Sequence, residues 1–172
     1  MSKEEYISEL KDYLLNKKKE ILTPKTNYAD YERDLKKYMV LNMRKSNFIN
    51  VLKNFEESSG YTPIQIYTRA WLSKEVYYGF YHRLDYNPKR ETLLALAIGL
   101  HLYVEDTKIL FQSCGYVFPC TTEDYVVVFF MEKDLYAKGN AVDDYEDLSF
   151  VNDLLEAVNC KLLGKKSREN KF

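Results

Sequence analysis

Three cysteines and two histidines are the softest metal-ligand candidates in this 172-residue chain. A structural zinc site needs about four such ligands at close spacing. Cys114 and Cys120 are separated by five residues and have no histidine nearby, and Cys160 makes the cysteine count odd. No zinc motif can be assembled from these positions. The sequence therefore predicts no metal site, and the cysteines are interpreted as buried structural thiols.

Catalytic chemistry is equally hard to build from the titratable residues. His101 is flanked by two leucines, where a structural histidine is expected rather than a general base. The acid pairs Asp143-Asp144 and Glu146-Asp147 fall in a polar stretch that favours a solvated loop. The chain has no glycine-rich phosphate loop, nucleophile elbow or two-histidine zinc helix. We therefore expect no enzymatic activity and no cofactor.

Residues 62–83 have types and spacing that suit the recognition of a nucleic acid. Thr62-Pro63-Ile64-Gln65 has the form of a capping box with proline at the first helical position. Ser73 is an N-cap candidate for a second helix, and Glu75 lies in its first turn, where the helix dipole favours an acid. Only three residues separate the two predicted helices. That spacing is typical of a helix-turn-helix.

Other helices must position this pair, and apolar residues recur at helical spacing along most of the chain. A run rich in β-branched and aromatic residues, 125–131, favours a buried strand when taken alone. Because Thr122-Glu123-Asp124 resembles a helix start and its neighbours are helical, we predict a buried helix there instead. The remaining predicted helices are an N-terminal one ended by Pro24, then 28–43, 48–55, one starting at Asn87-Pro88, 107–113 and 148–158.

Charge divides the chain more sharply than its net value of −1 suggests. Residues 44–118 hold 9 basic and 7 acidic side chains, whereas residues 119–163 hold 3 basic and 10 acidic ones. Nucleic-acid binding through bulk charge alone would need a more basic balance. We predict four regions: a helical arm (1–43), a helix-turn-helix domain (44–118), an acidic and helical extension (119–163) and a mobile tail (164–172).

The segment from Thr62 to Leu100 resembles the lambda-repressor-like, Cro-type helix-turn-helix family. Ala70-Trp71-Leu72-Ser73 matches the family's turn, in which a glycine usually follows the alanine. The family's asparagine-proline signature and following leucine pattern are matched by Asn87, Pro88, Glu91, Thr92, Leu93, Leu96, Ala97 and Leu100. A looser similarity to a group of uncharacterised bacterial helix-turn-helix proteins covers about Phe48 to Gly164. The resemblance implies an all-α fold in which a five-helix domain carries helical N- and C-terminal extensions.

If the second helix of the motif enters a major groove, its outward side chains decide the sequence preference. Counted from Ser73, Tyr77 and Phe80 point inward. The expected base-contacting residues are Lys74 for a guanine edge or a phosphate, Glu75 for cytosine, Tyr78 for a thymine methyl or a phosphate, and His82. The expected phosphate-contacting residues are Thr62, Arg83, Lys89 and Arg90.

The chain departs from the family at the residues that usually approach DNA. Pro63 stands where family members often carry a phosphate-holding glutamine, so Thr62 and exposed amides remain. Trp71 replaces the turn glycine, and Tyr67 replaces a small alanine that lets the two helices approach closely. The sixteen tyrosines do not indicate base stacking on single strands, because most fall at core spacing without interleaved basic residues.

Two functions remain open from the sequence. The first is a DNA-binding transcriptional regulator that acts as a homodimer on double-stranded DNA. The second is a protein-interaction module, such as an adaptor, an inhibitor or an antitoxin-like partner, that keeps the scaffold without reading DNA. The first requires Lys74, His82, Arg83, Lys89 and Arg90 on one face, clear of the acidic extension. The absence of a signal-like apolar start or an apolar run of about eighteen residues predicts a cytoplasmic chain without a membrane span.

Overall fold

The computed structural model describes residues 1–21, 33, 46–83, 87–137 and 146–164. These residues form eight helices and no strand, which confirms the predicted all-α class. The helices are α1 (Lys3–Ile21), α3 (Ser46–Ser59), α4 (Pro63–Arg69), α5 (Lys74–His82), α6 (Arg90–Gly99), α7 (Val104–Ser113), α8 (Thr122–Glu132) and α9 (Glu146–Ala157). None of the helices in these ranges combines the length and the apolar character that a bilayer crossing requires.

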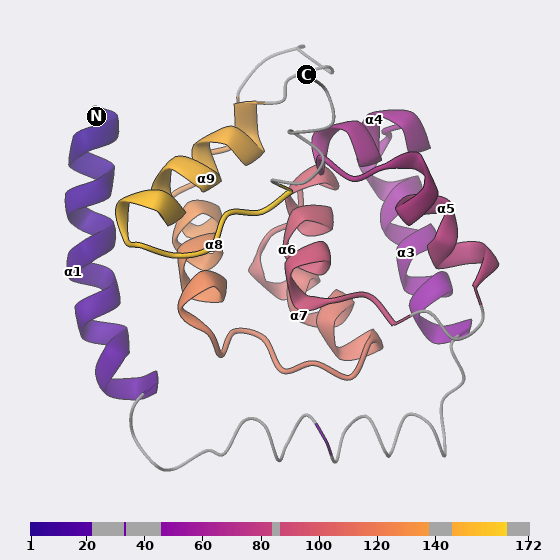
Figure 1. Cartoon of the computed structure of the whole chain (residues 1–172), viewed down its shortest axis with the longest axis horizontal. Helices are drawn as coiled ribbons and strands as arrows, with labels where there is room; N and C mark the ends of the chain where they lie inside the picture. The colour runs from indigo at the N-terminus through magenta and orange to yellow at the C-terminus, as the bar shows by residue number, and fades with distance from the viewer. Residues whose placement is uncertain (22–32, 34–45, 84–86, 138–145, 165–172) are drawn as a thin grey trace.

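Helix α6 forms the centre of the molecule, as its nearly all-apolar sequence predicts. Every residue from Leu93 to Gly99 is buried. Helices α4, α7 and α9 pack directly on α6, and α3 packs on α7 (Figure 1). Gly99 permits the contact with α4, because a Cβ built there would lie 2.8 Å from the Ile66 carbonyl oxygen.

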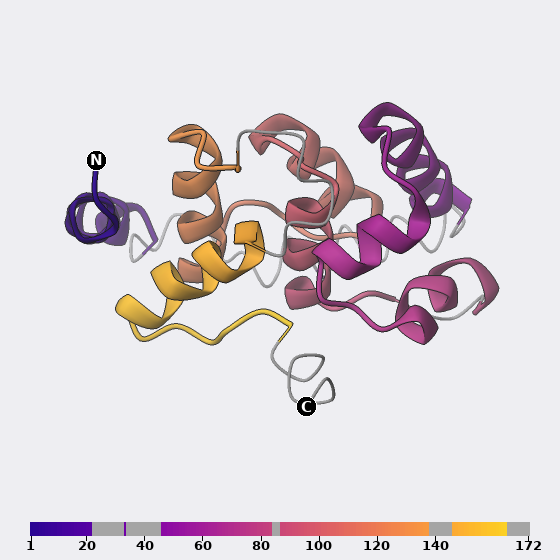
Figure 2. The same ribbon diagram turned by 90° about the horizontal axis from the view of Figure 1, so that it is seen from above.

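The run 125–131 is helical, as predicted, and is buried on nearly all sides within α8. Thr121 caps this helix with a complete capping box, in which Asp124 is the reciprocal partner. Helix α1 covers α8 at one end of the molecule, with the Tyr13 and Phe129 ring centroids 5.6 Å apart. Helices α3, α4 and α5 lie at the opposite end (Figure 1, Figure 2). One hydrophobic core nevertheless contains residues from Leu10 to Leu163.

Two helices begin at other residues than predicted. Helix α6 starts at Arg90 instead of at Asn87-Pro88, because Lys89 is its N-cap and the Pro88 carbonyl accepts a hydrogen bond from the Tyr116 hydroxyl at 2.9 Å. Helix α7 starts at Val104, three residues before the predicted start. Apart from Arg33, the predicted helix 28–43 lies outside the described residues, as do Asp143-Asp144 and residues 165–172.

Candidate nucleic-acid interface

The α4–α5 pair has the local geometry that its capping residues predict. The Thr62 side chain accepts a hydrogen bond from the Gln65 amide, and the Gln65 side chain accepts one from the Thr62 amide. Ser73 caps α5 by accepting a hydrogen bond from the Val76 amide at 3.1 Å. Trp71 takes the left-handed conformation expected of the turn position, with a φ of 52°. Burial of the indole offsets the strain of that conformation.

Helix α5 is oriented by aromatic side chains on its inner face. Tyr77 and Phe80 are fully buried, as predicted from the spacing. The Phe80 ring meets Phe48 of α3 edge-on, with centroids 5.6 Å apart. The Tyr77 ring packs on Tyr67 of α4 at the same centroid distance. Tyr67 therefore takes the place of a small residue by serving as a packing partner between the two helices.

A carboxylate on α3 fixes the rotation of α5. The hydroxyls of Tyr77 and Tyr81 both donate to the same oxygen of Glu56. Burial, together with the negative charge of Glu56, raises the pKa of both tyrosines well above the usual range. Both hydroxyls therefore remain protonated donors at neutral pH. Sequence reasoning missed Glu56, which resembles any polar residue late in an exposed helix.

The outer face of α5 presents most of the expected base-contacting residues. Lys74, Glu75 and His82 are exposed, as is Arg83, an expected phosphate contact directly after the helix. Tyr78 is half-buried, because its ring packs edge-on against Tyr67 and Tyr77. Helix α5 lies at the end of the molecule away from α1, and α8 and α9 of the acidic extension lie nearer to α1 than to α5 (Figure 1, Figure 2).

The expected phosphate-contacting residues are placed less uniformly. Thr62 and Lys89 are exposed at the starts of α4 and α6. The Arg90 side chain is only 18% exposed and forms an ion pair with buried Asp124 of α8. It also donates to the Val117 carbonyl at 2.9 Å. Arg90 thus connects α6 to α8, through a partner that lies 34 positions away in the sequence.

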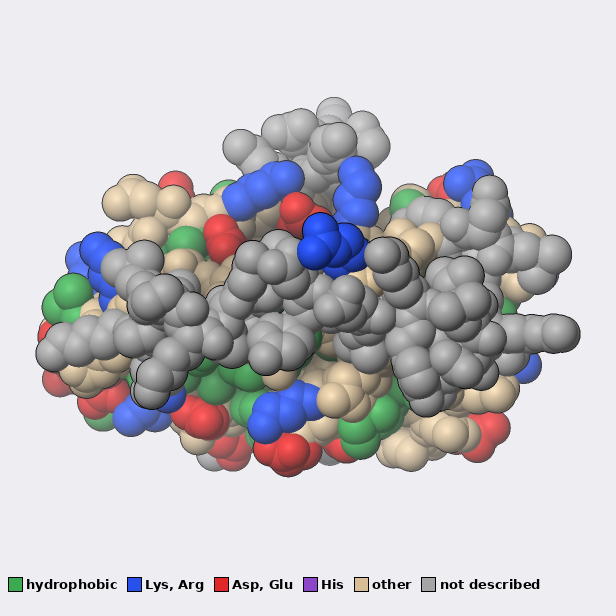
Figure 3. Space-filling view, turned by 90° about the horizontal axis from the view of Figure 1, so that it is seen from below, with side chains coloured by type: hydrophobic (Ala, Val, Ile, Leu, Met, Phe, Trp, Pro, Cys, Tyr) green, Lys and Arg blue, Asp and Glu red, His purple; other side chains and the backbone are tan. Residues whose placement is uncertain are grey.

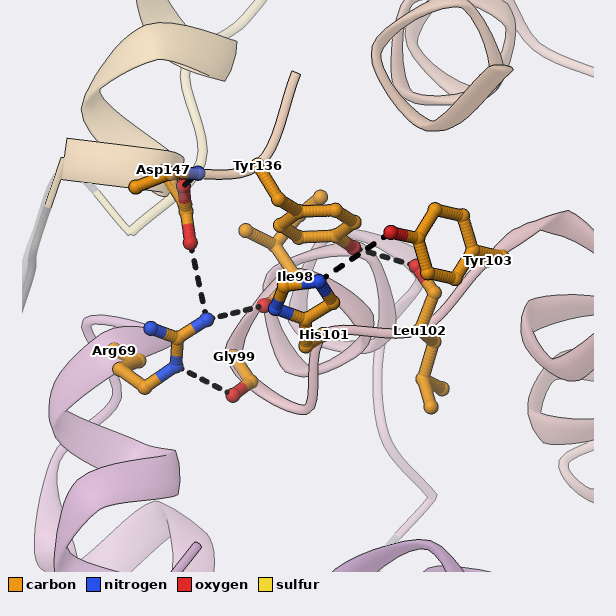
Figure 4. A network of polar contacts seen from close by, with 9 residues as sticks. Arg69, Ile98, Gly99, His101, Leu102, Tyr103, Tyr136 and Asp147 are labelled. Carbon is orange, nitrogen blue, oxygen red and sulfur yellow. Dashed lines mark hydrogen bonds and ion pairs between the residues drawn. The ribbon is translucent and has the colours of Figure 1, made fainter. Parts of the chain in front are cut away.

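A buried ion pair connects the motif to the C-terminal helices (Figure 4). Arg69 of α4 and Asp147 of α9 have side chains that are each 5% exposed, and their nearest nitrogen and oxygen are 3.1 Å apart. Arg69 Nε also donates to the Gly99 carbonyl at 2.9 Å, and the guanidinium lies 4.5 Å from the centroid of the Tyr61 ring. The other Asp147 oxygen accepts from the Ala137 amide at 2.7 Å. Both charges are therefore compensated.

The position of Asp147 corrects the interpretation of Glu146-Asp147 as part of a solvated loop. Both residues belong to α9, and the Asp147 side chain lies inside the protein. A signal for this pair exists in the sequence. Arg69 and Asp147 each fall on the apolar stripe of a helix, beside Ile66 in one and Val151 in the other. Opposite charges on two apolar stripes are compatible with burial only as a pair.

A second connection joins the end of the described chain to the turn of the motif. Gly164 has a φ of 64°, and a Cβ built there would lie 2.8 Å from the Cβ of Trp71. The Asn152 side chain holds the preceding residue by donating to the Leu163 carbonyl at 2.9 Å and accepting from its amide at 2.8 Å. The C-terminal extension is thus packed against the α4–α5 turn.

Among the described residues, the cysteines form no competing site. No cluster of metal-ligating side chains occurs in the part of the chain that the structure describes. Cys114 is buried, whereas Cys120 and Cys160 are half-buried. Burial, with a smaller contribution from the nearby Glu123, raises the pKa of Cys160 to about 11, so this thiol stays protonated. On the face in Figure 3, basic and acidic side chains are interspersed over the described residues.

Comparisons of the chain with protein-family models, curated protein sequences and solved structures find no match. Its function must be inferred from its own residues.

His101 lies beside the buried ion pair and stacks on the ring of Tyr136, with centroids 3.9 Å apart (Figure 4). Burial, with a smaller contribution from the positive charge of Arg69, lowers the pKa of His101 from its usual 6.5. The unfolded chain therefore binds a proton before the folded chain does as the pH falls. The stability that neutral His101 contributes is complete above about pH 6.5 and is lost below it.

We expect the free energy of unfolding in urea to fall between about pH 7 and pH 5.5 more steeply in the parent than in His101→Asn. Asparagine suits the left-handed φ of 57° at this position. The measurement is a urea titration followed by circular dichroism at each pH. Equal slopes in the two proteins would show that His101 is not linked to stability.

Proposed function

We propose that this chain is a lambda-repressor-like, sequence-specific DNA-binding protein that acts as a dimeric transcriptional regulator. The observation that carries the proposal is the exposure of Lys74, Glu75 and His82 on the outer face of α5 and of Arg83 directly after the helix. Lys74 and Glu75 stand at the N-terminal end of α5, the part of a recognition helix that contacts base edges. Arg83 follows the last turn and can hold a phosphate.

The role of each side chain follows from its exposure. Lys74 donates to a guanine edge, and Glu75 accepts from a cytosine amine. Tyr78 contributes only the exposed part of its ring to a thymine methyl or a phosphate. Thr62 and Lys89 remain available for the backbone, whereas Arg90 is assigned a structural role by its ion pair with Asp124. Two copies on a two-fold site would place their α5 helices about 34 Å apart.

Selection from a random pool of double-stranded DNA, followed by fluorescence polarisation at about 50 mM salt, tests this proposal. We expect Lys74→Ala combined with Arg83→Ala to lower the affinity by about 10- to 100-fold, since a base contact is worth about 1–3 kcal/mol. The matched control is Lys3→Ala combined with Lys133→Ala, which removes the same charge at the opposite end of the molecule. Unselective binding, or equal affinities for both double variants, would reject the proposal.

A protein-interaction module is the second candidate function. Ile64 of α4 is 62% exposed, an apolar side chain next to Pro63, the position where members of the resembled family often hold a phosphate. The basic and acidic side chains interspersed on the face in Figure 3 also give the described part of that face no strong attraction for a polyanion. This candidate gains support if the DNA selection recovers no common sequence and Ile64→Asp abolishes capture of a protein partner.

A further inference from the structure

A solvent-open groove of about 610 Å³ lies where α1 meets the ends of α8 and α9. One face of α1, the first residue of α8, the last residue of α9 and the two residues after it line this groove: Lys11, Leu14, Leu15, Lys18, Thr122, Ala157, Val158 and Asn159. The groove belongs to the end of the molecule that is remote from α5 (Figure 1). A partner seated there would therefore leave the outer face of α5 free.

The floor of the groove is apolar and open on one side. Leu15 is 63% exposed, although other residues of α1, such as Leu10, are fully buried against the core. Leu14 and Val158 are half-buried beside it. An exposed leucine at the edge of an apolar hollow is the usual anchor for one face of an amphipathic helix.

The rim of the groove is positively charged. Lys11 and Lys18 are both exposed, and neither forms an ion pair among the residues that the structure places. They are seven residues apart, so two helical turns, or about 10.5 Å, separate them. Thr122 is the first residue of α8, where the helix dipole adds a partial positive charge.

Two acidic side chains, one on α1 and one on α9, are engaged with other cations. Asp153 of α9 pairs with Lys3 at 2.6 Å, and Glu9 of α1 pairs with Lys133 at 2.9 Å. Lys17 is directed elsewhere, with its ammonium group 5.7 Å from the Tyr13 ring and 5.8 Å from the Tyr125 ring. The two groove lysines thus remain available to charges brought by a partner.

A second copy of this chain fits the groove poorly. An antiparallel pairing of two α1 helices centred on Leu14 and Leu15 would set Lys11 of each copy opposite Lys18 of the other. Like charges that face each other across an interface oppose association. A free polyanion such as DNA would satisfy the lysines but would leave the exposed Leu15 without an apolar contact.

We propose that the groove binds an acidic amphipathic helix of a partner protein. Apolar side chains on one face of that helix enter between Leu15 and Val158. Two carboxylates, two turns apart, pair with Lys11 and Lys18. Together with α5 at the other end, this groove makes the chain a connector between its target and an acidic protein segment.

The test uses two fluorescein-labelled 18-residue peptides, both with leucines at helical spacing. One peptide carries two glutamates seven residues apart, and the other carries lysines at the same two positions. Fluorescence anisotropy should show that the full-length chain binds the glutamate peptide at least about tenfold more tightly than the lysine peptide. Lys11→Glu combined with Lys18→Glu should reverse this preference. Leu15→Asp should lower the affinity of the glutamate peptide by about tenfold or more.

Matched variants separate the groove from general effects. Lys53→Glu combined with Lys108→Glu is the control for the lysine reversal, because it changes the same charge on α3 and α7. Ile109→Asp is the control for Leu15→Asp, because Ile109 is an exposed aliphatic side chain outside the groove, at 48%. Both should bind the glutamate peptide like the parent. Equal binding of the two peptides, or no effect of the Lys11 and Lys18 reversal, overturns the proposal. The proposal is also overturned if the parent chain binds neither peptide but self-associates, and Leu15→Asp abolishes that self-association. This result would assign the groove to a second copy of the chain.

Discussion

Replacing Asp147 with alanine is expected to destabilise the fold by about 3–5 kcal/mol, because the change leaves the Arg69 guanidinium buried without a counter-charge. Both side chains of the pair are 5% exposed, so water cannot take the place of the lost carboxylate. The Ala137 amide loses its acceptor at the same time. Urea unfolding followed by circular dichroism measures this loss as a lower transition midpoint.

The exposed pair Lys3–Asp153 provides the control for this experiment. Its nitrogen and oxygen are only 2.6 Å apart, closer than those of Arg69 and Asp147, but the side chains are 46% and 42% exposed. Asp153→Ala should therefore cost less than about 1 kcal/mol. Similar losses in the two variants would show that burial does not determine the contribution of the Arg69–Asp147 pair.

Gly99→Ala is expected to destabilise the protein by about 1–3 kcal/mol, as overpacking between two helices does. A Cβ at this position would lie 2.8 Å from both the Ile66 carbonyl oxygen and the Ala70 Cβ. The first of these is backbone, so α4 and α6 would have to separate. Thermal and urea unfolding of the variant measure the effect.

The same substitution at Gly79 should have the opposite sign. Gly79 lies within α5, and the nearest atom to a Cβ built there is the flexible Arg83 Cδ at 3.9 Å. Gly79→Ala should stabilise the fold by about 0.5–1 kcal/mol, since alanine favours a helix over glycine. The close contact assigned to Gly99 would be contradicted if both variants, or neither of them, lost stability.

These effects bear on the proposed function because the α4–α5 pair is not an independent unit. Arg69 of α4 is held by Asp147 of α9, and Trp71 of the turn contacts Gly164 near the end of the described chain. Variants that weaken these contacts should lower DNA affinity in proportion to the fraction of unfolded protein. Substitutions at Lys74 or Arg83 should lower affinity while leaving the unfolding midpoint unchanged.

Local features of the fold were predictable from short stretches of sequence. The capping box at Thr62 and the N-cap at Ser73 were predicted because each depends on residues within one helical turn. The helix at 125–131 was predicted from the helix-start residues before it, although the run itself has a high β propensity. The start of α6 was misplaced by two residues or more, because the Pro88 carbonyl bonds to Tyr116, a residue distant in sequence.

The candidate interface was predictable only in part. Exposure of Lys74 and burial of Tyr77 followed from helical periodicity. The half-buried state of Tyr78 depends on Tyr67 of the preceding helix. The engagement of Arg90 depends on Asp124, and that of Tyr77 and Tyr81 depends on Glu56 of α3. Periodicity predicts which face of a helix is buried, but it does not predict which residues of other helices contact that face.

For the described residues, the sequence by itself determined the all-α class, the starts of α4 and α5 and the inner face of α5, since all of these depend on contacts within a few residues. Tertiary structure alone decided which charges are free to act. Arg69 and Arg90 are as basic as Arg83, but packing draws the first two into buried or half-buried ion pairs and leaves Arg83 exposed. The physical reason is that desolvation of a charge depends on the helices that surround it, and those helices come from distant parts of the chain.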